Sequence, residues 1–316
     1  MVAHMPSLSV TPKSNATKGR SLTQDAIQRL FRNSTGMLGL MIILFVIIIS
    51  ALAPLLYPYD AKRDRNLKLK TTAPTWTLSQ QELDEKDLTR WSHVFGTDSN
   101  GRDVLIRVWH GGRISLTVGL LAVILSSSIG ILLGLVSGFF GGRIDQFISW
   151  LVDVLLAFPG ILLAIAIAAA LGPSLQNSLL AISVTQIPVY IRIVRAVTLS
   201  LREAEYVQAA RSLGSKSPRL IFSHIFPNGL SPLIVQLTLS IGSAILDVAA
   251  LGFLGLGAQP PMPEWGAMIS DGFDKFRQAP WMSFFPGVAI FFTVIGFNLL
   301  GDGIRDAFDP RLKNVS

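Results

Sequence analysis

The sequence predicts an all-α membrane protein with six transmembrane helices, and three features of its composition support this fold class. Half of the 316 residues are apolar and only 15% are charged, whereas roughly a quarter of residues are charged in globular domains. The mean hydropathy is +0.50. The charges leave uncharged runs of 20 to 38 residues, and a helix needs about 20 apolar residues to cross a bilayer. Intrinsic disorder is excluded, and the lack of cysteine excludes a disulfide scaffold and thiolate chemistry.

The spans are expected, in order, at residues 36–59, at 114–142, as two helices within 146–191, at 230–257 and at 280–301. The run at 146–191 is interrupted only by Asp153 and is too long for a single helix. Gly172-Pro173-Ser174 divides it, because Gly and Pro interrupt helices and Ser can cap the next one. The sequence therefore predicts six spans.

The first span has an alternative interpretation as a secretory signal with a cleavage site at Ala51-Leu52-Ala53. The polar leader of about 35 residues is too long for such a signal, and Pro54 directly follows the site. We therefore expect this helix to stay in the membrane.

The distribution of Lys and Arg predicts the orientation, since cytoplasmic loops carry an excess of these residues. With the N-terminus inside, the inner segments hold 15 basic and seven acidic residues, whereas the outer ones hold 12 and 11. The net charge of +7 is thus a sign of orientation and does not call for a nucleic-acid partner. The expected organisation is a cytoplasmic tail at 1–35, a first transmembrane helix at 36–57, an extracytoplasmic segment at 58–112, a five-helix core at 113–304 and a cytoplasmic tail at 305–316.

Two sets of residues inside the spans stand out. Gly130, Gly134 and Gly138 recur every four residues, so they line one helix face and permit close packing within the bundle or between subunits. Asp153 and Asp247 are acidic residues within apolar runs, where ionisable groups are functional candidates. Each could line a transport path or hydrogen-bond to a neighbouring helix and hold the bundle.

The sequence contains no catalytic pattern. The four histidines are scattered, and neither a nucleophile elbow nor a phosphate-binding loop occurs. The stretch from Asp98 to Asp103 fails as a calcium loop, because Asp103 stands where that loop needs Gly and Trp109 where it needs Glu. We therefore expect no catalytic, cofactor-binding or metal-binding residues, and a turn at 98–103 that leads into a helix.

The most elaborate inner segment lies between the fourth and fifth spans. A helix is expected from Glu203 to Leu213, with acidic residues in its first turn and Gly214 as its stop. Ser217 is the expected N-cap of a second helix, with Pro218 at its first position. Pro227 is expected to end that helix. The sequence thus predicts two short helices that project from the inner face.

This segment resembles the EAA loop of ABC-importer permeases, whose pattern is E-A-A-x3-G-x9-I-x-L-P. Ala209, Ala210, Gly214 and Pro227 match in spacing, whereas Gln208, His224 and Phe226 replace Glu, Ile and Leu. Glu203 or Glu205 could supply the acidic contact that Gln208 lacks. The stretches at 95–103, 249–261, 263–266 and 298–306 are similar to the second, C-type permease of the dipeptide/oligopeptide/nickel family.

The resemblance implies a type I ABC importer permease fold in a bacterial inner membrane. It implies four kinds of partner: the lipid bilayer, a homologous permease subunit, two ATP-binding ATPase subunits and an extracytoplasmic solute-binding protein. The ATPase subunits would contact the loop at 203–227, in which we single out Glu203, Glu205, Gln208, Ala209, Ala210, Gly214, Pro218 and Pro227. The two alanines and Gly214 would let the helix pack closely, and ATP hydrolysis would take place on the partners.

The implied cargo is a di- or oligopeptide, with nickel, haem or another small solute as alternatives. Two other classes remain open at this point. One is a secondary transporter driven by an ion gradient, which would need broken helices at matching positions of two halves. The other is an assembly or export component that uses the same bundle without transporting cargo.

Overall fold

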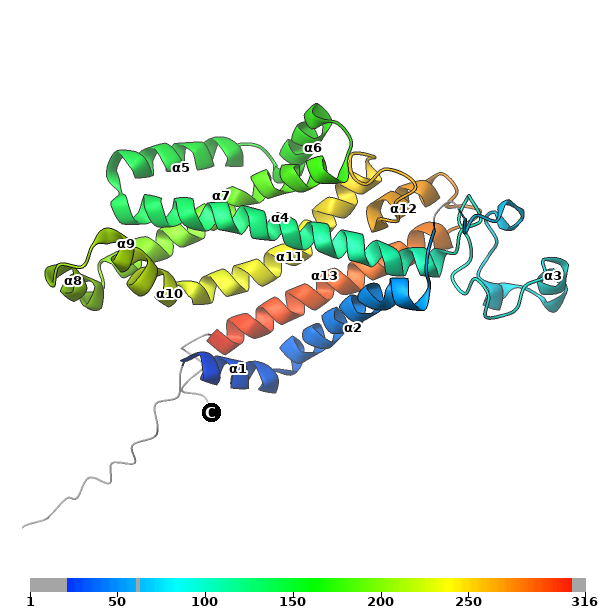
Figure 1. The fold of residues 1–316 in the computed structure, drawn as a ribbon, viewed down its shortest axis with the longest axis horizontal. Helices are drawn as coiled ribbons and strands as arrows, with labels where there is room; N and C mark the ends of the chain where they lie inside the picture. Colours follow the sequence, from blue (N-terminus) through cyan, green and yellow to red (C-terminus); the bar gives the residue numbers. More distant parts are fainter. Residues whose placement is uncertain (1–21, 61–62, 309–316) are drawn as a thin grey trace, which may run out of the picture.

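The computed structural model describes residues 22–60 and 63–308, with side chains from Ile27 onward in the first helix. Residues 1–21 and 309–316, most of the two predicted tails, lie outside the described residues. The described chain is helical, with turns and one isolated β-bridge between Thr97 and Asp103. Figure 1 shows an elongated bundle whose long helices run side by side, with small elements gathered at its two ends.

Within residues 22–60 and 63–308, five helices are long and apolar enough to cross a membrane. They are α2 (Ser34–Leu56), α4 (Val104–Phe140), α7 (Leu175–Arg202), α11 (Leu230–Phe253) and α13 (Trp281–Phe308). A sixth span is formed if the bent pair α5 (Gly142–Leu156) and α6 (Gly160–Leu171) is counted as one. The predicted all-α membrane fold is therefore confirmed.

The third span differs from the straight helix that the sequence suggested. Its two halves, α5 and α6, meet at an angle of 88°. Pro159 is the N-cap of α6 and lies in the break, where proline cannot continue the hydrogen bonding of the preceding turn. The break expected at 172–174 is present as well, and the Ser174 hydroxyl caps α7 by accepting the Asn177 amide at 3.1 Å.

Two helix limits also differ from the expected ones. The helix expected after the turn at 98–103, α4, begins at Val104, where Asp103 caps it by accepting the Ile106 amide at 3.1 Å, and it continues unbroken into the second span, which was expected to start at residue 114. Its first turns thus fall inside the predicted extracytoplasmic segment. The predicted N-terminal tail contains a helix, α1 (Leu22–Arg32), which packs against α2 and α13.

The glycine stripe of α4 packs against α7. A Cβ added at Gly134 would lie 2.7 Å from the Cβ of Val194, and one at Gly138 would lie 2.7 Å from the Cβ of Thr198. Gly130 would meet Tyr190 in the same way. Small residues at this spacing let two helix backbones approach closely, so the stripe fixes α4 against α7 within this chain.

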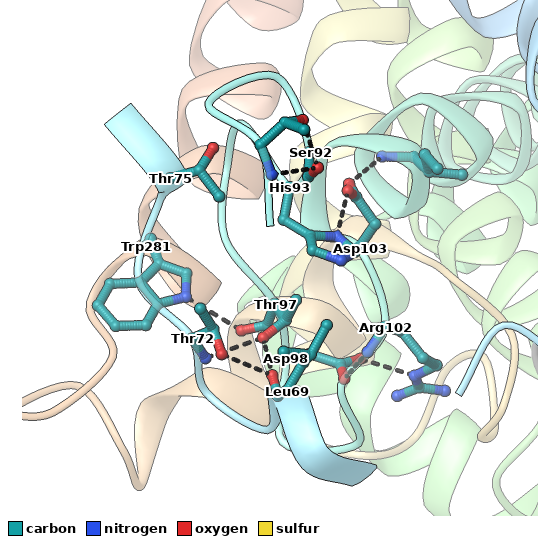
Figure 2. A network of polar contacts seen from close by, with 12 residues as sticks. Leu69, Thr72, Thr75, Ser92, His93, Thr97, Asp98, Arg102, Asp103 and Trp281 are labelled. Atoms are coloured by element: carbon teal, nitrogen blue, oxygen red, sulfur yellow. Dashed lines mark hydrogen bonds and ion pairs between the residues drawn. The ribbon is translucent and has the colours of Figure 1, made fainter. Parts of the chain in front are cut away.

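The external segment contains η1 (Leu67–Leu69), η2 (Thr75–Thr77) and α3 (Gln80–Glu85), and it lies at the end of the bundle where α4 begins. It packs on the membrane helices through Phe95, which stacks on Phe285 of α13 at 3.8 Å between ring centres. In Figure 2 the indole of Trp281, at the start of α13, faces the Thr97 backbone. Its Nε1 donates to the Thr97 carbonyl oxygen at 3.0 Å.

A buried ionic cluster ties the same segment to α4. The Asp98 carboxylate accepts the Arg102 backbone amide at 2.9 Å and the Arg102 Nε at 2.7 Å, and it also pairs with Arg107 of α4. Burial alone would raise the pKa of Asp98, but the Arg107 and Arg102 charges and the backbone donors hold it below its ordinary value. The turn expected at 98–103 is thus present and serves as a structural anchor.

The end of α11 is joined to the start of α13 by a loop and by α12 (Trp265–Phe273), at the same end of the bundle as the start of α4. Glu264 is fully buried and caps α12, because its carboxylate accepts the Gly266 and Ala267 amides at 2.9 and 2.8 Å. The Ser115 hydroxyl of α4 donates to the same carboxylate at 3.0 Å. Burial raises the pKa of Glu264. Glu264 lies in the stretch 263–266 that carries part of the resemblance, but its capping role was not predicted, because Glu is not among the residues preferred as N-caps.

Candidate functional site

The loop predicted at 203–227 lies at the end of the bundle opposite the external segment (Figure 1). Its first helix, α8 (Glu205–Ser212), begins two residues later than expected, with Ala204 as N-cap. Val207 is fully buried. It belongs to an apolar cluster that includes Leu220 of the loop, Leu135 of α4 and Val194 of α7. The loop is therefore packed onto the ends of two long helices.

Gly214 ends α8 in a conformation that suits glycine. Its φ is +83°, in the left-handed region. The Gly214 amide donates to the Arg211 carbonyl oxygen at 2.9 Å, and the Ser215 amide donates to that of Ala210 at 3.1 Å. These two bonds form a Schellman motif, which closes the carbonyl end of a helix. Apart from its two chain neighbours, no described residue lies within 4 Å of a Cβ built at Gly214, so backbone conformation and not close packing is its role here.

The second half of the loop contains α9 (Ser217–Arg219), the π-helical turn η3 (Leu220–Ile225) and α10 (Phe226–Asn228). Its start differs from the expectation by one residue, because Lys216 is the N-cap and Pro218 occupies the second helical position. Pro227 does not end the helical run as predicted, because it lies within α10. The run is interrupted at Gly229, directly before α11 begins.

Polar contacts join the loop to the end of α4. The Arg202 guanidinium donates to the carbonyl oxygens of Gly138 and Phe139, each at 3.2 Å, and to Glu203 at 2.9 Å. The Gln208 side-chain amide donates to the Arg202 carbonyl oxygen at 3.1 Å and to Glu203 at 3.4 Å. The carbonyls at the end of α4 lack helical partners, so Arg202 both satisfies them and fixes the loop. Glu203 is the acidic residue nearest to Gln208.

The outward side of the loop carries exposed side chains. Leu213 is 88% exposed, and Tyr206, Ala209 and Phe222 are exposed as well. Glu205 and Pro218 are also on the surface, whereas Ala210 is half-buried. A compact unit that is anchored on one side and presents apolar groups on the other can receive a partner and move with it as a rigid body.

Asp153 lies on α5 and pairs with Arg192 of α7 at 2.9 Å, with both side chains more than half exposed. A second pair lies nearby, where Arg195 Nη2 donates to Asp145 at 2.7 Å. Ion pairs between exposed side chains contribute little to stability. The two pairs connect the first half of the bent span to α7, and Asp153, Arg192 and Arg195 line a cavity of about 340 Å³.

Asp247 lies in the middle of α11, half-buried, and faces the side chain of Gln186 on α7. It does not come together with Asp153, which pairs elsewhere. Among the residues that the structure describes, no group of three or more His, Asp or Glu is arranged to hold a metal ion.

Comparisons with known proteins agree with this geometry. The sequence profile described as "Binding-protein-dependent transport system inner membrane component" matches residues 130–314. The profile described as "N-terminal TM domain of oligopeptide transport permease C" matches residues 21–74. Together these two matches include the first span, the loop and the last span.

Three relatives align over nearly their whole length. The dipeptide transport system permease protein DppC of Alkalihalophilus pseudofirmus is 47% identical over 92% of this chain and 90% of its own. The di/tripeptide transport system permease protein DppC of Pseudomonas aeruginosa is 44% identical over 90% and 91%. The oligopeptide transport system permease protein OppC of Bacillus subtilis is 39% identical over 94% and 92%.

The fold is similar to that of a solved transporter. A chain of the inward-facing MetNI methionine ABC transporter superimposes with a TM-score of 0.53 at 17% identity, over 65% of this chain and 96% of the other. The chain therefore belongs to the family of inner-membrane permease components of binding-protein-dependent transport systems and has the type I ABC importer permease fold.

Proposed function

We propose that this chain forms half of the translocation path of an ATP-driven importer for di- and oligopeptides. The observation that carries the proposal is the loop at 203–227, a compact unit fixed to the ends of α4 and α7 with an exposed apolar surface. The cargo is proposed from the relatives, which are named as dipeptide, di/tripeptide and oligopeptide transport permeases.

The loop is the proposed contact with the ATPase subunits. Arg202 and the buried Val207 cluster link it to α4 and α7. A displacement of the loop by a closing ATPase dimer would therefore move both helices together. A homologous permease would supply the other half of the path, and an external binding protein would deliver the cargo. Both termini and the loop would then lie in the cytoplasm, as the Lys and Arg distribution indicates.

Two single-cysteine variants test docking and orientation together, because the native chain contains no cysteine. Leu213 of the loop is 88% exposed and Trp91 of the external segment is 87% exposed, so the two positions are matched in accessibility. We expect Leu213→Cys to cross-link to an ATPase subunit and Trp91→Cys to the binding protein. A membrane-impermeant thiol reagent added outside intact cells should label only Trp91→Cys. Labelling of Leu213→Cys from outside would contradict the proposal.

A further inference from the structure

A cavity of about 380 Å³ opens beside the outer half of α4. Its polar lining comes from Tyr59 and from His110, Arg113 and Thr117 of α4. Its apolar walls include Leu175 at the start of α7 and Pro263 in the loop before α12. Ligand sites commonly combine a volume of roughly 300 to 1,000 Å³ with apolar walls and a few polar groups. The cavity therefore has the size and composition of a site for a small molecule.

Arg113 is the charged group of this cavity. The side chain is exposed, and no hydrogen bond or ion pair joins it to another residue in the described part of the chain. The nearby arginines of the external anchor differ, since Arg102 and Arg107 are both buried against Asp98. Among the described residues, Arg113 is thus a cation beside the cavity without a counter-ion of its own.

The depth of Arg113 makes this isolation costly. Trp109 packs edge-on against Tyr57, just after the end of α2, and aromatic residues of this kind mark the membrane–water interface. Arg113 follows Trp109 by four residues, about 6 Å further along the helix. An unpaired charge below the interface is expensive unless it faces a water-filled cavity and serves a function.

The surroundings of Arg113 distinguish it from a side chain that faces lipid. Along the middle of α2 the exposed side chains are bulky and apolar, among them Leu44, Phe45 and Ile48. Arg113 instead shares its exposed face with Thr117 and is walled by α7 and by the loop before α12. The guanidinium of Arg113 is therefore beside a protein-walled cavity with further polar lining groups.

We propose that Arg113 binds the terminal carboxylate of the peptide as it enters this cavity from the outer side. The inference rests on the proposed function and names a recognition residue within it. Peptides of one length differ in their side chains but share a terminal carboxylate, which a planar guanidinium binds through two parallel hydrogen bonds. The apolar walls can accept varied side chains, so this arrangement suits a permease that transports many peptides.

Thiol labelling tests the anion preference of the cavity in the assembled transporter. Thr117→Cys places a unique cysteine of this chain one turn from Arg113. We expect an anionic methanethiosulfonate reagent to label it several-fold faster than a cationic one, and Arg113→Gln to abolish that ratio. A free dipeptide should slow the labelling, whereas its C-terminal amide should not. Equal labelling rates, or a ratio that follows only the anionic lipid content of the vesicles, would overturn the proposal.

Peptide uptake provides the second measurement. Proteoliposomes with the complete importer are given a free dipeptide or its C-terminal amide, each at a concentration that saturates the binding protein. The measured quantity is the ratio of the two uptake rates, acid to amide. Because that protein is the same throughout, the change in the acid-to-amide ratio isolates the pairing of Arg113 with the carboxylate. We expect Arg113→Gln to lower this ratio about tenfold, Arg113→Lys to lower it less, and Arg90→Gln in the external segment to leave it unchanged. An unchanged ratio in Arg113→Gln would refute the proposal.

These outcomes separate the inference from the proposed function. If the wild-type importer takes up no peptide while Thr117→Cys keeps its anion preference, the assignment of peptide cargo fails and the anion site stands. If uptake is normal and Arg113→Gln lowers acid and amide equally, the residue supports the structure and does not recognise the carboxylate.

Discussion

Substitution of Gly214 offers a sharp test of how the loop is built. The φ of +83° lies in the left-handed region, which costs an L-residue about 1–2 kcal/mol. Apart from its two chain neighbours, no described residue lies within 4 Å of a Cβ at this position, so side-chain volume should matter little within this chain. Asn tolerates the left-handed conformation, and β-branched residues do so least. The expected order of loop stability is therefore Gly, Asn, Ala and Val.

The penalty should appear as opening of the end of α8. A cost of about 1–2 kcal/mol corresponds to a 5- to 30-fold increase in opening. Hydrogen exchange at the Ser215 amide, which donates to Ala210, should accelerate by about that factor in Gly214→Ala and further in Gly214→Val. In the reconstituted importer the peptide transported per ATP hydrolysed should fall in the same order, with membrane insertion intact. The conformational argument is refuted if Gly214→Asn accelerates exchange at the Ser215 amide as much as Gly214→Val does. It is also refuted if Gly214→Ala has no effect and only larger side chains accelerate exchange.

Three further predictions concern the bundle and its anchor. Gly134→Ala should lower the free energy of unfolding of the purified permease by about 1–3 kcal/mol, since a Cβ there would lie 2.7 Å from a side chain of α7. Gly160→Ala is the control and should leave it unchanged, because the added Cβ meets nothing within 4 Å. Asp98→Asn should cost about 3–5 kcal/mol, because it leaves two buried arginines without their counter-charge. The pKa of Asp98 is lower in the folded than in the unfolded state, so its contribution to stability is present above the unfolded pKa of about 3.9 and is lost as the pH falls through the folded pKa. The free energy of unfolding of the wild type should therefore fall below about pH 4. An equally steep fall in Asp98→Asn would contradict this. Asp153→Asn should change stability by less than about 1 kcal/mol, since both partners of its ion pair are exposed.

Much of the fold follows from the sequence, because apolar runs and their interruptions are local signals. The break before α7 was predictable from Gly172-Pro173-Ser174, and Pro159-Gly160 is a similar signal for the bend between α5 and α6 that was not used. A helix after the turn at 98–103 was predicted, but its continuation without a break into the second span was not, because charged residues near Arg107 suggested an external segment. Those charges are neutralised by Asp98, a contact between separate elements that hydropathy does not reveal.

The candidate site was predictable to a smaller degree. The two-helix form of the loop follows from Gly214 and Pro218, but the position of Pro227 within a helical turn depends on the packing of η3 against α4 and α7. The ion pair between Asp153 and Arg192 could not be predicted, because the sequence does not show that α5 and α7 lie side by side. Arg113 gave no signal, because an arginine near the end of a span is ordinary until the cavity beside it is visible.

The central claim is that this chain imports peptides with energy from ATPase partners acting through the loop at 203–227. Its most direct test is uptake of a labelled dipeptide into proteoliposomes that contain this chain, its homologous permease, the ATPase subunits and the binding protein. We expect uptake to require enclosed ATP, to stop when the ATPase subunits are inactivated and to continue when ionophores collapse all ion gradients. Uptake that persists without ATP hydrolysis and disappears with the ion gradient would contradict the account and identify a secondary transporter.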